Sequence, residues 1–338
     1  MEKQISEQKS HMVWIDWMKV LGIYFIIVGH IFPVGKEFVY AFSVPLFFLI
    51  SGFLSHREED CSVFWQKLWY NLIVPMLLFT LITYLWRQAS NIIRGNFDFN
   101  TLWILPLNIL VGNGGQGYEG VGLIAMWFVY SLCILKIILQ YLPKELEFVA
   151  ILVISLFCVA GSVAINDAGF EVYNAWPNTS LAFPFFALGY ASRQHKQRLN
   201  NLVINYWYII PFVISLIVIY ECGIHNGIVY LYRASYGGNY IIYLLSSFAG
   251  IFAIFTLSKA LQGVKLKSIS LLGGTIIILG AHQILISILE KFRLINVVTF
   301  LDYLFAFLIL IAFIPIIKII RKYVPILYGT YRVTCWRN

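Results

Sequence analysis

The sequence predicts an all-α, polytopic membrane protein that folds as one transmembrane bundle of about ten helices. Of its 338 residues, 60% are hydrophobic and 12% are charged, and the mean hydropathy is +0.79. A soluble domain carries about 25% charged residues, so this chain has too few polar side chains to cover a soluble surface. Aromatic residues make up 17% of the chain, which suits a lipid-facing surface with two interfacial belts. Soluble, disordered and coiled-coil proteins are therefore excluded.

Ten segments are long and apolar enough to cross a bilayer, which takes about 20 residues of helix. They must be helices, because the backbone polar groups of an open strand would stay unpaired in lipid. The first segment contains Asp16 and Lys19 and no small-residue cleavage motif, so we expect a retained helix and not a signal peptide. The expected spans are 13–34, 38–55, 68–87, 122–142, 147–165, 178–192, 202–221, 239–260, 271–290 and 297–320.

Basic residues indicate which side of the membrane the termini occupy. With ten spans both termini lie on one side, and 18 of the 24 lysines and arginines fall on that side. Basic loops stay in the cytoplasm, so we expect cytoplasmic tails at 1–12 and 321–338. The whole chain, 1–338, is expected to form one membrane-embedded domain with no appended soluble domain. The six basic residues of the other side are Lys36, Arg87, Arg94, Arg233, Lys291 and Arg293.

Metal, disulfide and nucleic-acid sites are not predicted. The five cysteines form no CxxC pair, and the six histidines form no HxxH or HExxH pair. The net charge of +8 could indicate nucleic acid, but the charges separate apolar runs and do not form a basic face. We therefore expect neither a bound metal nor a nucleic-acid partner.

The longest external segment runs from Arg87 to about residue 121. Gly112–Gly117 fits GxGxxG, but no βαβ unit surrounds it, so it carries no nucleotide signal. The simplest interpretation is a connecting loop. The alternative is a re-entrant or lid segment beside an acceptor site, with Tyr118 and Glu119 at its rim.

The first expected span carries Asp16, Lys19 and His30. Charge inside a span is costly, so each of these residues is a functional hypothesis. Lys19 and His30 are eleven residues apart, which is three turns plus about 20°, so they share a helix face with a rise of about 16 Å. Asp16 precedes Lys19 by three positions, and we expect the two to pair.

Structural roles are the alternative for these residues. Lys19 could extend to the cytoplasmic headgroups, and His30 could be a hydrogen-bonded packing residue. Their alignment with a buried Asp–Lys pair favours function. His282, in the ninth span, is a third candidate, whereas Asp302, near the start of the tenth, can be explained as an interfacial carboxylate.

Asp16-Trp17-Met18-Lys19, followed by an apolar run to Gly29-His30, resembles the opening of the acyltransferase-3 family of bacterial membrane O-acyltransferases. That family opens with Asp-x-x-Arg and a histidine eleven residues after the arginine, so Lys19 replaces the arginine here. Asn71 stands where the third helix of the family often has a basic residue. Further similar stretches follow in family order at Val44–Leu54, Leu72–Pro75, Trp127–Phe128, Phe183–Tyr190 and Leu272–His282.

The resemblance implies transfer of an acyl group, usually acetyl, from cytosolic acyl-CoA to a hydroxyl of a carbohydrate or cell-envelope glycan. The enzyme would lie in the bacterial inner membrane and would use acetyl-CoA as a co-substrate, with no bound cofactor. Lys19 would contact the CoA phosphates, Lys67 and Asn71 would lie near them, and His30, with Asp16 on the same helix, would act as general base.

The remaining motifs have structural interpretations first. Ser51-Gly52 would permit close helix packing. Trp127 would pack the bundle, with pocket lining as its second role. His282 would orient the acceptor or substitute as base, and Glu119 would contact the acceptor from the external loop.

Several alternatives stay open at this point. A transporter or permease would also have about ten spans and buried charges, although matched discontinuous helices are not found. A membrane sensor or assembly protein could retain the family fold without activity. The acceptor could be O-antigen, capsule, a lipid-linked sugar, a small glycan or an amine. The membrane lipid around the bundle is a further expected partner. Transfer could be direct or pass through an acyl-histidine, and the oligomeric state is not predicted.

Overall fold

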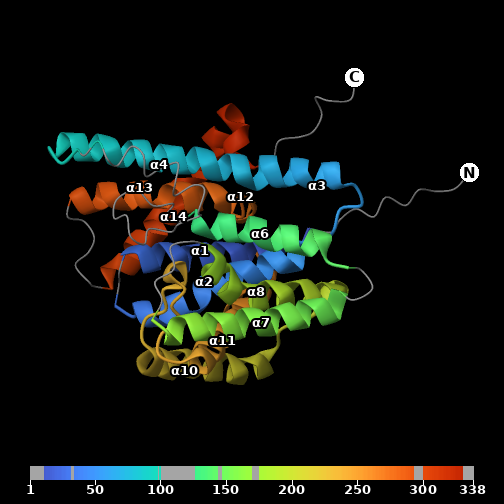
Figure 1. The fold of residues 1–338 in the computed structure, drawn as a ribbon. Coiled ribbons are helices and arrows are strands. Elements are labelled where there is room, and N and C mark those ends of the chain that lie inside the picture. The colour runs from blue at the N-terminus through green and yellow to red at the C-terminus, as the bar shows by residue number, and fades with distance from the viewer. Residues whose placement is uncertain are drawn as a thin grey trace, which may run out of the picture.

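A computed structural model describes residues 11–31, 34–97, 99, 126–143, 147–169, 175–292 and 300–329. These residues are predominantly helical and form no strand, apart from one antiparallel bridge between Tyr230 and Ser235. In Figure 1 the main helices run roughly side by side along one direction, as in a membrane bundle.

Each of the ten expected segments contains a helix. The bounds are α1 (Val13–Ile31), α2 (Lys36–Leu54), α3 (Cys61–Leu68) continued through a π-helical turn (Trp69–Ile73) into α4 (Val74–Ile93), α6 (Trp127–Tyr141), α7 (Glu147–Asp167), α8 (Ala175–Ser192), α10 (Ile209–Asn226), α11 (Tyr240–Ala260), α13 (Thr275–Lys291) and α14 (Leu301–Tyr323). Two short helices also occur: α9 (Lys196–Asn201) precedes α10, and α12 (Lys267–Leu272) precedes α13.

Seven helical segments of the described chain are long and apolar enough to cross a membrane by length and composition. α6, α8 and α13 are not among them. The all-helical class is confirmed, whereas the count of ten crossings and the cytoplasmic side of the termini stay predictions.

Two expected spans differ from the helices observed. The segment expected at 68–87 belongs to a continuous helix of 33 residues from Cys61 to Ile93. The segment expected at 271–290 is interrupted at Gly273-Gly274, between α12 and α13. A Cβ on Gly274 would lie 2.6 Å from the ring of Tyr328, so the close approach of the C-terminal turn requires glycine there.

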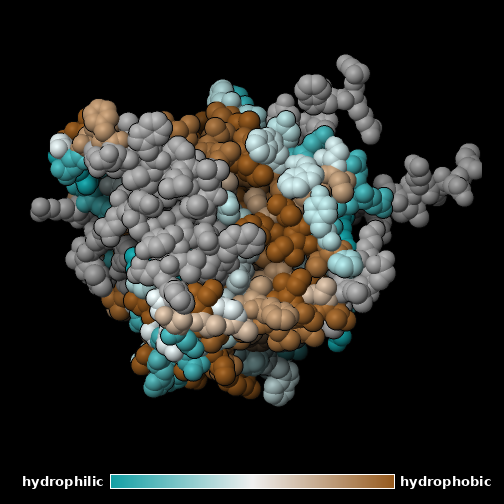
Figure 2. Space-filling view, viewed as in Figure 1, coloured by the Kyte–Doolittle hydropathy of each residue, from teal (hydrophilic) through white to brown (hydrophobic). Residues whose placement is uncertain are grey.

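α1 lies at the centre of the bundle, in contact with α2, α11, α12, α13 and α14 (Figure 1). Twelve of its nineteen residues are buried. By contrast α7 and α10 expose large apolar side chains such as Phe157 and Ile209, which are 75% and 61% exposed. In Figure 2 hydrophobic residues occupy much of the middle of the visible face, and hydrophilic residues gather mainly at the helix ends. This pattern places lipid on the outside of the bundle and α1 far from it.

α2 and α8 cross at a pair of glycines. A Cβ on Gly52 would lie 2.0 Å from the carbonyl oxygen of Phe186, and one on Gly189 would lie 2.0 Å from that of Leu49. No side chain fits at either position, because the two backbones are in contact. Small residues commonly allow such close approach in membranes. The predicted packing role of Ser51-Gly52 is confirmed.

We predict that Gly52→Ala lowers the thermal stability of the purified protein in detergent, because the new methyl group forces the α2 and α8 backbones apart. Overpacking of this kind costs about 1–3 kcal/mol. Gly161→Ala in α7 is the matched control, since a Cβ there meets no atom within 4 Å. Equal unfolding temperatures for Gly52→Ala and the wild type would contradict this account of the crossing.

Candidate active site

One face of α1 carries the residues around which the site is built. Ile15, Lys19, Ile23, Ile26 and His30 follow at spacings of four, four, three and four residues, so they form a single stripe along the helix. Three separate pockets of the protein lie along this stripe, and each is lined by some of these residues. The predicted common face of Lys19 and His30 therefore coincides with a series of cavities.

His30 is paired with His282 of α13. The two ring centroids are 4.8 Å apart and the rings are tilted by 56°. The side chain of His282 is fully buried, and its Nδ1 lies 2.9 Å from the carbonyl oxygen of Ile278. A carbonyl only accepts hydrogen bonds, so Nδ1 of His282 must carry the hydrogen. Its Nε2 then holds a lone pair, and this atom has no hydrogen-bond partner among the described residues.

Tyr40 fixes the backbone next to His30. Its hydroxyl donates a hydrogen bond of 2.8 Å to the carbonyl of Gly29. A Cβ on Gly29 would lie 2.1 Å from the Tyr40 ring, so the ring occupies the space that a side chain would fill. The Gly29-His30 sequence therefore lets α2 press against α1 at the level of the imidazole.

The central pocket is small and mainly apolar. It has a volume of about 50 Å³ and lies between His30 and the α1 residues below it. Trp127, for which a pocket-lining role was the second interpretation, does line it, and Thr275 adds a hydroxyl. The other lining residues are Ile23, Ile26, Val44, Phe47, Phe128 and Leu279.

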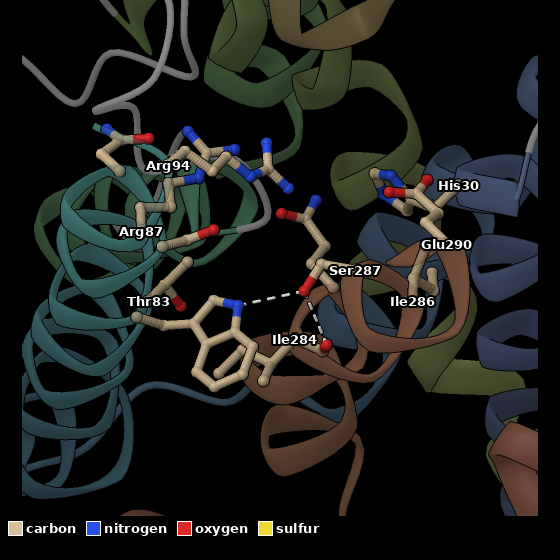
Figure 3. Close-up of a pocket in the computed structure, with 12 residues that line it drawn as sticks. His30, Thr83, Arg87, Arg94, Ile284, Ile286, Ser287 and Glu290 are labelled. Carbon is tan, nitrogen blue, oxygen red and sulfur yellow. Dashed lines mark hydrogen bonds between the residues drawn. The ribbon is translucent and has the colours of Figure 1, made fainter. Parts of the chain in front are cut away.

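The outer pocket, of about 480 Å³, is larger and polar, and His30 lies in its wall. α4 and α13 form its other walls, as Figure 3 shows. A hydrogen bond of 3.0 Å from the Trp86 indole to the Ser287 hydroxyl joins the two helices. The polar lining residues are Thr83, Arg87, Ser90 and Asn91 from α4, its capping residue Arg94, and Gln283, Ser287 and Glu290 from α13.

The inner pocket, of about 330 Å³, surrounds Lys19 at the other end of the stripe. Arg193 and Lys196, from the junction of α8 and α9, bring two further cations to it. His11, Asp16 and His56 line it as well. The sequence did not predict Arg193 and Lys196 as site residues, because they are far from Lys19 in the chain. They were interpreted only as basic residues of a cytoplasmic loop.

Asp16 and Lys19 are close enough to interact electrostatically, but they form no contact ion pair. Asp16 Oδ2 lies 2.9 Å from His11 Nε2 instead. A spacing of three residues permits a contact pair but does not impose it, and the chain before α1 brings His11 close enough to compete. The same carboxylate also lies 3.3 Å from the position of a Cβ on Gly273, at the break before α13. Among the described residues, the ammonium group of Lys19 thus has no carboxylate in direct contact at the inner pocket.

Lys67 and Asn71 do not line the inner pocket. Lys67 Nζ forms an ion pair of 2.7 Å with Glu58 Oε1. Burial alone would raise the pKa of the Glu58 carboxyl, but the hydrogen bond from Lys67 and the charges of His56 and Lys67 hold this pKa below its usual value. Asn71 lies in the π-helical turn, where its backbone carbonyl packs against Gly329. The structure thus brings Arg193 and Lys196, and not these two residues, to Lys19.

Asp302, in the first turn of α14, is 1% exposed, and its Oδ2 has no hydrogen-bond partner among the described residues, so its carboxylate is buried within the protein. It lines none of the three pockets. Glu119, with Tyr118 and the Gly112–Gly117 segment, lies outside the described residues.

The fold and the cavities along α1 define a multi-pass membrane protein in which His30, beside the buried His282, lines two pockets. The acyltransferase-3 family model, described as an acyltransferase domain, matches residues 12–319. The chain belongs to this family, and the family supports a membrane acyltransferase. Comparison with curated proteins and with solved structures gives no match.

We predict that His282 is the Nδ1–H tautomer in the resting protein, because Ile278 accepts only from a protonated Nδ1. Nitrogen-15 NMR of histidine-labelled protein measures the tautomer directly, and the His282→Gln variant identifies the signal. An Nε2–H signal for His282 would contradict the arrangement described for the pair.

Proposed function

We propose that the protein is a membrane O-acyltransferase that takes an acetyl group from cytosolic acetyl-CoA and transfers it to a hydroxyl of a carbohydrate or cell-envelope glycan in the bacterial inner membrane. The observation that carries the proposal is the order of the pockets along α1. A basic pocket, a small apolar pocket and a large polar pocket follow one another, and His30 lies between the last two. Such an order suits a donor and an acceptor that approach from opposite ends.

The inner pocket suits the phosphate groups of the donor. CoA carries a pyrophosphate and a ribose phosphate, and three cations, Lys19, Arg193 and Lys196, line this pocket. Lys19 supplies a point charge, whereas the planar guanidinium of Arg193 can bind two phosphate oxygens at once. Arg193 therefore offers the bidentate contact that the replacement of the family arginine by Lys19 removes.

The stripe above Lys19 suits the rest of the donor. Ile23 and Ile26 present an apolar surface along which the pantetheine arm can extend for the roughly 16 Å between Lys19 and His30. The central pocket, of about 50 Å³, is small, and this supports acetyl over longer acyl groups. Trp127 and Thr275 would then contact the thioester end.

The reaction follows from the position of the imidazole. A nitrogen of neutral His30 accepts the proton of the acceptor hydroxyl as the hydroxyl oxygen attacks the thioester carbonyl carbon. A tetrahedral intermediate forms, the carbon–sulfur bond breaks, and the CoA thiolate leaves. The thiolate receives the proton from His30, so the products are CoA and the O-acetylated acceptor, and the imidazole is neutral again.

His282 is proposed as the positioning partner of His30. Its tautomer is fixed by Ile278, so its Nε2 lone pair can accept a hydrogen bond from the His30 ring when His30 rotates or becomes protonated. Direct attack requires no covalent intermediate, and the outer pocket leaves room for an acceptor beside the same imidazole.

We expect His30→Ala to reduce acetyl transfer by about 10²- to 10⁴-fold, the usual contribution of a general base. The measurement is transfer of the acetyl group from acetyl-CoA to envelope glycans by the purified protein. The product, acetylated glycan, is quantified by mass spectrometry. His225→Ala, which removes an exposed histidine at the end of α10, is the matched control.

Full activity in well-folded His30→Ala would show that His30 is not the base. Failure of the wild type to bind or use acetyl-CoA would remove the enzyme proposal itself and leave the transporter or non-catalytic alternatives.

A further inference from the structure

We propose that the outer pocket recognises an anionic acceptor, one that carries a carboxylate or phosphate group beside the hydroxyl to be acylated, and that Arg87 and Arg94 bind this group. The inference rests on the proposed function, because it names the chemical class of the acceptor at the same site. It starts from two cations for which the described residues supply no partner.

Arg87 lies on α4, and Arg94 is the residue that ends this helix, seven positions or about two turns further along the same face. Both line the outer pocket, and in Figure 3 they lie on the α4 side of the opening. No ion pair or hydrogen bond joins either guanidinium to another described residue. Arg87 is half-buried, and a half-buried guanidinium without a partner is costly, so an anion in the pocket would offset that cost. Arg94 is exposed at the mouth of the pocket, where its charge can add to the attraction for the same anion.

The chemistry of the lining fits a single anionic group on a polar molecule. Glu290 also lines the pocket, and the charged side chains among the described lining residues sum to +1 when His30 is neutral. Guanidinium groups bind carboxylate and phosphate through paired hydrogen bonds. Asn91, Gln283 and Ser287 supply the amide and hydroxyl groups that sugar hydroxyls require.

Because His30 lines the same pocket, an anionic group bound by the arginines would orient the acceptor relative to the imidazole. An acceptor whose charged group is held on α4 would have its orientation restricted, and a neighbouring hydroxyl could then be presented to the imidazole. A neutral sugar would lack this anchor and would bind through hydroxyl contacts alone. Arg87 and Arg94 are thus specificity-determining residues in this proposal.

The phosphate of a membrane lipid is the competing anion, since both arginines come from the end of a membrane helix. Snorkelling side chains extend outward to headgroups. These two share a cavity with His30 and with residues of α13, which points to a ligand inside the protein. Lipid binding is therefore treated as an outcome that the experiment must separate.

The experiment uses three small probes with the full-length protein in detergent: methyl glucuronide for a carboxylate, glucose 1-phosphate for a phosphate, and methyl glucoside as the neutral match. Binding is measured as the rise in unfolding temperature with probe concentration. The variants are Arg87→Gln and Arg94→Gln, and Lys291→Gln is the matched control, because Lys291 ends α13 at the same end of the molecule without lining the pocket. The same titrations in nanodiscs with or without phosphatidylglycerol test lipid competition.

We expect at least one anionic probe to bind about tenfold or more tightly than methyl glucoside, as hydrogen bonds to a charged group allow. Arg87→Gln and Arg94→Gln should abolish this preference, while Lys291→Gln keeps it. The relative binding of the carboxylate and phosphate probes identifies the preferred anion.

Three results would overturn the inference: equal binding of neutral and anionic probes, an anionic preference that survives both arginine variants, or loss of all probe binding in phosphatidylglycerol nanodiscs. These are distinct from failure of the proposed function. A wild type that binds the anionic probe but not acetyl-CoA would retain the anion site and lose the enzyme assignment.

Discussion

The site depends on one face of α1, which holds a cation and an imidazole about 16 Å apart in the interior of a membrane protein. Isolated charges and imidazoles are costly in an apolar bundle, and this chain surrounds them with cavities and other polar groups. Lys19 shares its pocket with Arg193 and Lys196, and His30 packs beside His282. Because a helix is rigid along its axis, the distance between the two functional ends is set by backbone geometry.

The neighbours of α1 keep this face in register. Tyr40 from α2 bonds the Gly29 carbonyl, and the contact between Gly52 and Gly189 draws α8 tightly against α2. That second contact also positions the end of α8, from which Arg193 reaches the inner pocket. On the other side, α13 begins only after the Gly273-Gly274 break and places His282 against His30. The packing glycines and the geometry of the candidate site are therefore parts of one arrangement.

Sequence reasoning succeeded where one helix decides the outcome. The common face of Lys19 and His30 follows from helical periodicity, and the membrane class follows from composition. It failed for contacts between distant segments: the partner of Asp16 is His11, and Lys67 pairs with Glu58 instead of facing Lys19. No local sequence pattern predicts which side chains of different helices contact each other in a bundle. One further signal is readable in the sequence, namely the polar stripes at Thr83, Arg87, Ser90 and Arg94 and at Gln283, Ser287 and Glu290. Of these residues only Arg87 and Arg94 entered the sequence interpretation, as charges that indicate topology.

In the proposed function the face of α1 binds the donor along its length, with the phosphates at one end and the thioester at the other. A cryo-electron microscopy structure of the protein with bound coenzyme A would show the position of the donor. We expect phosphate density against Lys19, Arg193 and Lys196, an extended arm along Ile23 and Ile26, and the sulfur beside His30. Coenzyme A bound with its phosphates against Lys67 and Asn71, or in the pocket of Arg87, would contradict this proposal.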